Sequence, residues 1–276
     1  GKSVPYRMSE QKWADAYFDT VLGPIEKQGV DFWWLDWQQW PTSKYVKGLS
    51  NTFWLNHTFD HHMAEKGNER PMIYHRWGGL GSHRYQVGFS GDTYICWESL
   101  QFIHWFTPTA SNVGYGYWGH DIGGHYFHSE DKHEVDPELY LRWLQNGVFT
   151  PIFKTHCSKD RVIERRIWQF PNHMMDMRAT MHLRYALVPY IYAAARQTFD
   201  TGVSMCRPMY YSHPESDMAY SSKTQYMFGD DLLVASIITP ADKVTGLATR
   251  KVWLPKGEKW FNMVSGKMYE GSDEEV

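Results

Sequence analysis

Residues 29–40, GVDFWWLDWQQW, contain the stretch that decides the fold. The aromatic and aliphatic run over residues 32–35 is too short for a helix and is typical of a strand buried on both faces. It ends at the carboxylate of Asp36. Because parallel sheets and barrels place their chemistry at the carboxyl ends of strands, Asp36 is a candidate catalytic residue. The alternative is a structural aspartate that caps the next turn.

The same arrangement recurs along the chain. Further short apolar segments, over residues 71–74, 87–89, 114–118 and 148–153, lead to Arg76, Asp92, Asp121 and His156. Segments with helical periodicity lie between them, over residues 50–65, 97–109 and 136–147. This alternation predicts a parallel sheet with right-handed crossovers, and polar residues at successive strand ends favour a (β/α)8 TIM barrel.

The number of predicted strands is smaller than a whole barrel requires. A complete barrel has eight strands and typically about 250 residues. The segments before Gly202 supply five strand candidates. We therefore expect the C-terminal portion of a barrel, about strands 4–8, whose first units lie upstream.

Local signals predict where individual helices begin and end. Ser9 is a candidate N-cap for the first helix, which we expect to be interrupted near Gly23 and Pro24. Asp136 followed by Pro137 predicts another helix start. Residues 174–201 read as one long helix that ends at Gly202.

The sequence changes character after Gly202. Residues 231–238 form an apolar, β-rich run, and residues 250–254 and 260–262 flank a Pro-Lys-Gly-Glu turn as a predicted hairpin. We therefore predict two domains. Residues 1–201 form the C-terminal part of the barrel, and residues 202–276 form a small antiparallel β-sandwich domain that we expect to be incomplete.

Composition excludes several classes of protein. The formal net charge of −3 over 276 residues gives no basic surface of the kind that nucleic acids require. The three cysteines show no paired spacing, so neither a disulfide framework nor a zinc ribbon is indicated. No signal peptide or membrane-length apolar run occurs in this stretch, so we expect a soluble protein without membrane contact. The compartment is not indicated.

Aromatic residues are abundant, at 17% with 14 tryptophans. Aromatic rings can stack on the apolar face of a sugar, although most of them must simply pack in the core.

Five motifs occur in collinear order along nearly the whole chain. They are WLDW at 34–37, SGD at 90–92, HDIGG at 120–124, ELYLRWLQNGVFTPIFKTH at 138–156 and LRYALVPYIY at 183–192. Together they resemble glycoside hydrolase family 31, which comprises retaining α-glucosidases, α-xylosidases and relatives. The resemblance implies a (β/α)8 barrel followed by a proximal β-sandwich, and a carbohydrate substrate without a cofactor.

The resemblance also implies roles for individual residues. Asp36 matches the family's nucleophile, and Asp92 matches its acid/base. A retaining enzyme holds two carboxyl groups about 5 to 5.5 Å apart, so that one attacks the anomeric carbon while the other protonates the leaving oxygen and then activates water. Arg76, Asp121 and His156 match positions that bind the hydroxyls of the innermost sugar.

Further residues are expected to flank the sugar pocket. Trp34 and Trp118 are candidate stacking walls, with plain core packing as an equally weighted alternative. Phe89 stands where the family usually has Trp, and His125 stands where an aromatic residue commonly follows D-I-x-G. Gln39 replaces the glutamate of the family's D-x-x-E pattern. These departures bear on which sugar is bound more than on the type of reaction.

We therefore expect a retaining, exo-acting glycosidase of terminal α-linked sugars, most simply an α-glucosidase acting on an oligosaccharide or α-glycoside. An α-xylosidase or α-galactosidase of the same family is the nearest alternative. A non-catalytic carbohydrate-binding fragment and an interaction module also remain open. An incomplete barrel is expected to self-associate through its open edge and to lack activity in isolation if its pocket is incomplete.

Two groups of histidines offer a metal site as another alternative. They are His57, His61 and His62 on one predicted helix, and His120, His125 and His128 around Asp121. No glutamate follows His57, as the H-E-x-x-H arrangement requires, and histidines near sugars commonly donate hydrogen bonds. We therefore expect no catalytic metal.

Overall fold

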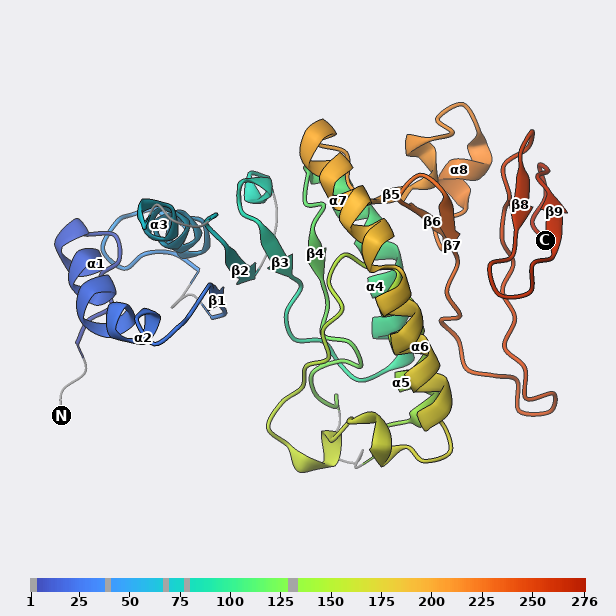
Figure 1. The fold of residues 1–276 in the computed structure, drawn as a ribbon, viewed down its shortest axis with the longest axis horizontal. Helices are drawn as coiled ribbons and strands as arrows, with labels where there is room; N and C mark the ends of the chain where they lie inside the picture. Colours follow the sequence, from blue (N-terminus) through green and yellow to red (C-terminus); the bar gives the residue numbers. More distant parts are fainter. Residues whose placement is uncertain (1–3, 38–40, 67–69, 77–79, 129–133) are drawn as a thin grey trace. The chain divides into compact units, whose positions relative to one another are not determined.

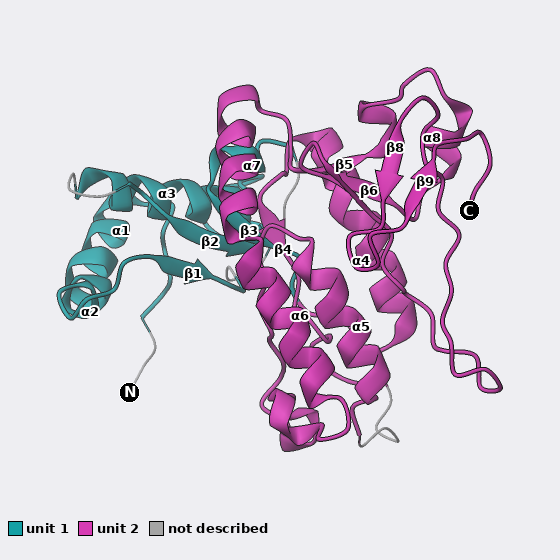
Figure 2. Cartoon of the chain, turned by 45° about the vertical axis from the view of Figure 1, so that its right-hand side comes forward, with its two compact units in different colours: residues 1–91 teal, residues 92–276 magenta. Residues whose placement is uncertain are grey.

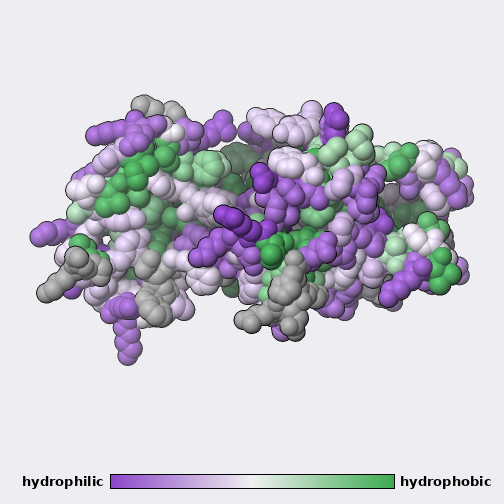
Figure 3. Space-filling view, turned by 90° about the horizontal axis from the view of Figure 1, so that it is seen from below, coloured by the Kyte–Doolittle hydropathy of each residue, from purple (hydrophilic) through white to green (hydrophobic). Residues whose placement is uncertain are grey.

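The computed structural model describes residues 4–37, 41–66, 70–76, 80–128 and 134–276 (Figure 1). The chain divides into two compact units, residues 1–91 and 92–276 (Figure 2). The predicted domain division after residue 201 is a different one, and it stays a prediction. On the face drawn in Figure 3, hydrophobic residues lie in separate groups between hydrophilic ones. Among the described helices, none combines the length and the apolar character needed to cross a membrane.

The first unit contains three short parallel strands: β1 (Trp33–Leu35), β2 (Ile73–Arg76) and β3 (Val87–Phe89). Leu35 pairs with His75, and Arg76 pairs with Phe89. The prediction that the first strand is buried on both faces is wrong, because Trp34 is 40% exposed. Side chains alternate along a strand, so Leu35 faces the core while Trp34 points to the other face.

Helices pack on this sheet and form the core of the first unit. α3 (Asn51–Glu65) contacts β2 and buries Leu55 and Phe59, as its periodicity predicts. These residues join Phe18, Leu22 and Ile73 in one hydrophobic cluster. The short 3₁₀ helix η2 (Ser82–Arg84) precedes β3.

The first helical segment is built differently from its prediction. α1 (Gln11–Tyr17) continues through the π-helix η1 (Phe18–Leu22) into α2 (Gly23–Glu26), so Gly23 and Pro24 do not interrupt it. Pro24 lies in the first turn of α2, where its missing N–H is tolerated. The predicted N-cap is also wrong, because Glu10 occupies that position and Ser9 Oγ lies 3.4 Å from Ser43 Oγ.

The second unit is centred on α5 (Pro137–Val148), which packs with α4 (Trp97–Thr109) and α6 (Met174–Ala186). Asp136 caps α5 as predicted, since its side chain accepts from the backbone N–H groups of Glu138 and Leu139 at 2.9 and 3.3 Å. Leu144 is fully buried in the main cluster, which also contains Leu100 of α4 and Met177 of α6. This core supports the loops that follow.

Two sequence predictions in this region are wrong in detail. The long helix predicted over residues 174–201 is divided at Leu187 into α6 and α7 (Val188–Thr201), because Pro189 cannot donate to the preceding turn. It does end at Gly202, as predicted. The strand predicted over residues 148–153 is reduced to an isolated parallel bridge at Ile152, and Val148 still belongs to α5.

Short elements carry the chain between these helices. After η3 (Ala110–Val113), β4 (Trp118–Gly119) replaces the strand predicted over residues 114–118. Parallel bridges from Gly119 to Ile152 and from Ile122 to Thr155 hold the next two loops side by side. The 3₁₀ helices η4 (Arg161–Ile163) and η5 (Ile167–Gln169) then lead to α6.

The remainder of the chain contains antiparallel strands, as predicted. β5 (Cys206–Pro208), β6 (Tyr226–Phe228) and β7 (Leu232–Val234) form one sheet, with η6 (Met209–Tyr211) and α8 (Asp217–Ser221) between β5 and β6. β8 (Lys259–Phe261) pairs with β9 (Met268–Glu270), so the hairpin predicted between residues 250–254 and 260–262 is wrong. Trp253 instead bridges to Glu275, and the amide of Gln225 bonds its backbone N–H and C=O.

Candidate active site

In the first unit, Asp36 and Arg76 form a close ion pair. Arg76 Nη1 donates to Asp36 Oδ1 at 2.6 Å. The two residues meet because β1 and β2 are parallel neighbours, so their carboxyl ends share one edge of the sheet. The backbone N–H of Trp37 donates to the same oxygen at 3.0 Å. Asp36 Oδ1 thus accepts from both a guanidinium and a backbone N–H.

Aromatic rings surround the Arg76 guanidinium. Its central carbon lies 4.6 Å from the centroid of the Trp37 ring and 5.7 Å from that of Phe89. Phe89 is buried and contacts Trp34 edge-on at 5.5 Å between centroids. Trp37, which is 63% exposed, was not among the predicted site residues, although it is the last residue of the WLDW motif. Exposed indole faces at Trp34 and Trp37 therefore lie next to Asp36.

In the second unit, backbone hydrogen bonds join three loops that carry the other predicted residues. The N–H of His125 donates to Thr93 C=O at 2.7 Å, and the N–H of Ile122 donates to Lys154 C=O at 3.0 Å. The N–H of Ser158 donates to His125 C=O at 2.9 Å. These bonds hold Asp92, Asp121 and His156 in one region.

Gly124 allows the HDIGG loop to approach its neighbour. It adopts φ +78°, and a Cβ at this position would lie 2.7 Å from Tyr94 O. Its N–H donates to Asp121 C=O at 2.9 Å and closes the turn. A side chain here would push the loop away, so the motif requires glycine.

Asp121 is completely buried and lies between basic groups. Lys154 Nζ is 2.6 Å from its Oδ1, and His125 Nδ1 is 3.7 Å from its Oδ2. The same His125 nitrogen lies 3.7 Å from Asp92 Oδ1. His125 thus contacts two of the predicted carboxylates, and Lys154 is a site residue that the sequence analysis missed, although it is two positions before His156.

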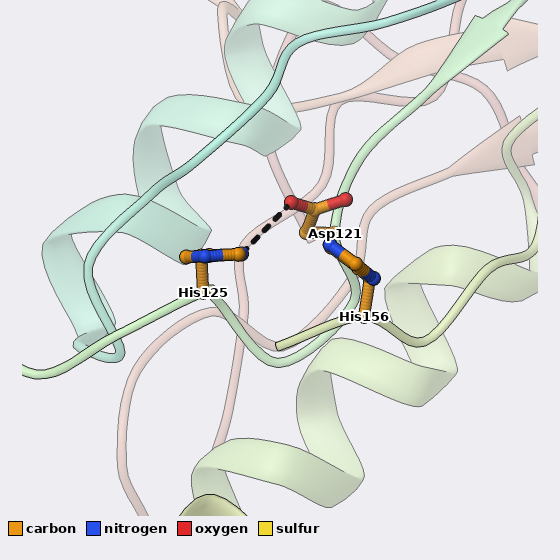
Figure 4. Close-up of side chains that lie close together, drawn as sticks. All are labelled: Asp121, His125 and His156. Carbon is orange, nitrogen blue, oxygen red and sulfur yellow. Dashed lines mark ion pairs between the residues drawn. The ribbon is translucent and has the colours of Figure 1, made fainter. Parts of the chain in front are cut away.

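His156 completes this group. Its ring centroid is 5.2 Å from that of His125, and Figure 4 shows both rings directed toward Asp121. Ligand atoms of Asp121, His125 and His156 all lie within 4.8 Å of one another, the only such group of His, Cys, Asp and Glu among the described residues. No ion is part of this structure.

Neither predicted group of three histidines is brought together as a whole, although His57 and His61 stack with 5.6 Å between ring centroids. His120 is buried against Thr107 Oγ1 at 2.8 Å, and burial together with Lys154 lowers its pKa to about 3. His128 packs on Tyr94 with 4.5 Å between centroids. His62 pairs with Glu26 at 3.1 Å. Among these histidines, His125 is the one that joins the group around Asp121.

Two further predicted residues, Trp118 and Gln39, and one residue that was not predicted, Arg165, complete the comparison with the sequence analysis. Trp118 is only 2% exposed and packs against Phe106 and Tyr115, so the core-packing alternative describes it. Gln39 lies outside the described residues. Arg165 was missed by the sequence analysis; it is buried, and its Nη1 donates to Ile122 C=O at 2.9 Å, which supports the HDIGG loop.

Comparison with protein families assigns both parts of the chain. Residues 6–194 match the glycosyl hydrolases family 31 TIM-barrel domain, and residues 202–276 match the glycosyl hydrolase family 31 C-terminal domain. The chain belongs to glycoside hydrolase family 31. The family that the motifs resemble is therefore confirmed, as are a TIM-barrel domain and a following domain with antiparallel sheets.

Curated relatives are similar over about three quarters of this chain. A probable glucan 1,3-alpha-glucosidase of Arabidopsis thaliana is 33% identical over 210 residues, which are 76% of this chain and 22% of the relative. An alpha-xylosidase of Saccharolobus solfataricus is 29% identical over 206 residues, 74% of this chain and 27% of the relative. The chain thus spans about a quarter or less of such curated family 31 proteins.

A solved structure agrees in fold. The cycloalternan-forming enzyme of Listeria monocytogenes, in complex with a pentasaccharide substrate, superposes with a TM-score of 0.81 at 25% identity. The match covers 98% of this chain and 26% of the Listeria protein. The family 31 fold therefore extends over both units of the chain.

Proposed function

We propose that this chain contains the catalytic carboxylates of a retaining α-glycosidase whose preferred substrate carries a terminal α-linked glucose. The proposal rests on one observation: Asp36, at the family's nucleophile motif, ends a parallel strand and is paired with Arg76 at 2.6 Å. We assign the strands and segments of residues 33–156 to about strands 4–8 of the barrel.

Asp36 acts as the nucleophile in this proposal. Hydrogen bonds from Arg76 and the Trp37 N–H fix its Oδ1, while its side chain keeps 34% of its exposure. Its carboxylate attacks the anomeric carbon and forms a covalent glycosyl ester as the leaving oxygen departs. Fixed donors orient the carboxylate before the reaction, so little reorganisation is needed in the transition state.

Asp92 acts as the acid/base. It donates its proton to the leaving oxygen, and in the second step it takes a proton from water as the water attacks the glycosyl ester. This restores both carboxyl groups and releases the sugar with its original configuration. His125 Nδ1 lies 3.7 Å from Asp92 Oδ1.

Sugar recognition falls to the remaining residues. Asp121 accepts from sugar hydroxyls with its charge balanced by Lys154, while His156 and His125 provide ring nitrogens beside it. Arg76 contributes through Asp36, and the exposed Trp34 and Trp37 rings offer stacking surfaces. The Phe89 ring is buried and packs edge-on against the Trp34 ring, which fixes the orientation of Trp34.

An α-xylosidase is the second candidate, favoured by the similarity to the Saccharolobus solfataricus alpha-xylosidase. Glucose and xylose differ in the hydroxymethyl group at C5, so the two activities differ by contacts to one substituent. Rates on aryl α-glucoside, α-xyloside and α-galactoside, measured side by side in the full-length protein, decide between them. We expect the highest kcat/KM on the α-glucoside.

Azide rescue tests the two catalytic roles separately. In Asp36→Ala, azide displaces an activated leaving group directly and gives the β-glycosyl azide, because one displacement inverts the anomeric carbon. In Asp92→Ala, azide attacks the glycosyl ester on Asp36 and gives the α-glycosyl azide. NMR of the products distinguishes the anomers. Near-normal hydrolysis by either variant, or the opposite anomers, would contradict the assignment.

A further inference from the structure

We propose that Asp121, His125 and His156 bind a transition-metal ion such as Zn²⁺, and that the bound ion excludes the sugar. The ion is an inhibitor of the enzyme and takes no part in the reaction. The exclusion of sugar rests on the proposed function, whereas the binding of metal does not.

The geometry of the three side chains suits a small divalent ion. Their ligand atoms lie within 4.8 Å of one another, and His125 Nδ1 is 3.7 Å from Asp121 Oδ2. Zinc bonds of about 2.0 to 2.1 Å in a tetrahedral site place ligand atoms about 3.3 Å apart. Small side-chain rotations bring the three groups to that spacing, and the fourth position is left for water.

Two of the three proposed ligands have buried polar atoms without a hydrogen bond among the described residues. Asp121 is 0% exposed, and neither of its carboxylate oxygens accepts a well-directed hydrogen bond from the described residues. His125 Nδ1 likewise has no hydrogen-bond partner in the described part of the chain. Buried polar atoms normally bond to protein, water or a ligand. A metal ion satisfies the Asp121 oxygen and the imidazole nitrogen at once.

Lys154 determines which ions are suitable. Its ammonium lies against Asp121 Oδ1, while Oδ2 faces His125. This positive charge works against Mg²⁺ and Ca²⁺, which depend on several carboxylate oxygens. Zn²⁺, Ni²⁺ and Cu²⁺ gain more from imidazole nitrogen, so we expect them to bind in preference.

His125 is the ligand best suited to a substitution test. It directly follows the HDIGG motif. His125→Phe therefore removes one metal ligand and retains an aromatic ring. His128→Phe is the matched control, because it removes a histidine three residues further on that contacts Tyr94 rather than Asp121.

Metal binding is measured directly, with protein purified without a histidine tag. The titrations use an His61→Ala background, because His57 and His61 stack on α3 and offer a second, exposed zinc ligand pair. Isothermal titration with Zn²⁺ and the visible spectrum with Co²⁺ report one site. We expect His125→Phe to weaken Zn²⁺ binding at least about tenfold and His128→Phe to leave it unchanged. Absence of Zn²⁺ binding, equal binding by both variants, or equal binding of Mg²⁺ would overturn the site.

A second measurement tests the exclusion of sugar. Zn²⁺ should raise KM for the aryl α-glucoside and leave kcat unchanged, and the sugar should reverse the Co²⁺ spectrum. If metal binds but sugar does not displace it, the exclusion is wrong while the site stands. If no glycoside is hydrolysed, the proposed function fails and the Co²⁺ spectrum still tests the metal site.

Discussion

Arg76 and Asp36, from neighbouring parallel strands, meet with 2.6 Å between Nη1 and Oδ1. Arg76 is 4% exposed, so its charge acts on Asp36 in a partly dry setting where pairing is stronger than at the surface. The residues are 40 positions apart in the sequence, and the parallel pairing of β1 and β2 brings them together.

We predict that Arg76→Gln lowers kcat/KM by about 10²- to 10³-fold, the usual effect of removing a fixed donor from a catalytic oxygen. Arg76→Lys should recover only part of this loss, because a lysine keeps the charge without the planar fork. Steady-state kinetics measure the effect, and melting temperatures identify any loss of folding. Wild-type kinetics for a folded Arg76→Gln would contradict the role.

Gly91→Ala should damage the same ion pair indirectly. Gly91 has φ +88°, and an added Cβ would lie 2.3 Å from Arg76 Nε. Gly257→Ala is the control, since Gly257 has φ +91° with no atom within 4 Å of an added Cβ. Both substitutions place a Cβ on a left-handed residue, which costs about 1 to 2 kcal/mol of backbone strain. We expect a fall in kcat/KM of at least about tenfold for Gly91→Ala alone, and equal activities would refute the link.

Buried histidines should make the second unit sensitive to acid. Burial, aided by the charge of Arg250, lowers the pKa of His104 to about 4. Burial, aided by Lys154, lowers that of His120 to about 3. In the unfolded chain both rings take up protons below about pH 6.5, so the unfolded state binds more protons. The free energy of unfolding should fall as pH drops from 6.5 to 4, by up to about 1.4 kcal/mol per pH unit for each ring.

Denaturant unfolding at several pH values measures this slope. His104→Gln should make the free energy of unfolding less dependent on pH, because the contribution of one of the two histidines is then absent. A stability that stays flat between pH 6.5 and 4 would show that these rings are charged or exposed in the folded protein.

Glu26 should respond to acid in a lower range. Burial opposes its charge, but hydrogen bonds from Lys66, Trp33 and His62 together hold its pKa below the usual value. Its stabilising effect is therefore complete above the unfolded pKa of about 4.5 and is lost as pH falls through the folded value. Glu26→Gln should lower the melting temperature at pH 7, and should lower it by less at pH 3. An equal loss at both pH values would point to packing instead.

The sequence predicted those features that depend on nearby residues. Asp136 and Pro137 predicted the start of α5, since capping involves atoms within three residues. The carboxylate ending β1 was also predicted, because apolar runs and polar strand ends are local patterns. Among the predicted site residues, Asp121 and His156 lie close together, and their roles stay predictions.

Features that depend on distant partners were not predicted. The backbone of Trp253 is hydrogen-bonded to the Gln225 side chain, 28 residues earlier. The local alternation of apolar and polar residues therefore could not show that Trp253 is not part of the predicted hairpin. Lys154 joins Asp121 only after two loops are bridged. Self-association through an open barrel edge and the domain boundary after residue 201 stay predictions.

The π-helix of residues 18–22 sets the direction in which the side chains of α2 point. A wide turn accommodates one extra residue, and in a regular helix each residue rotates the chain by about 100°. Glu26, four residues beyond the wide turn, is aimed at Lys66 and His62 of the α3 end because of that added rotation. Removing a single residue from this turn would swing the carboxylate to another side of the helix and separate it from both cations.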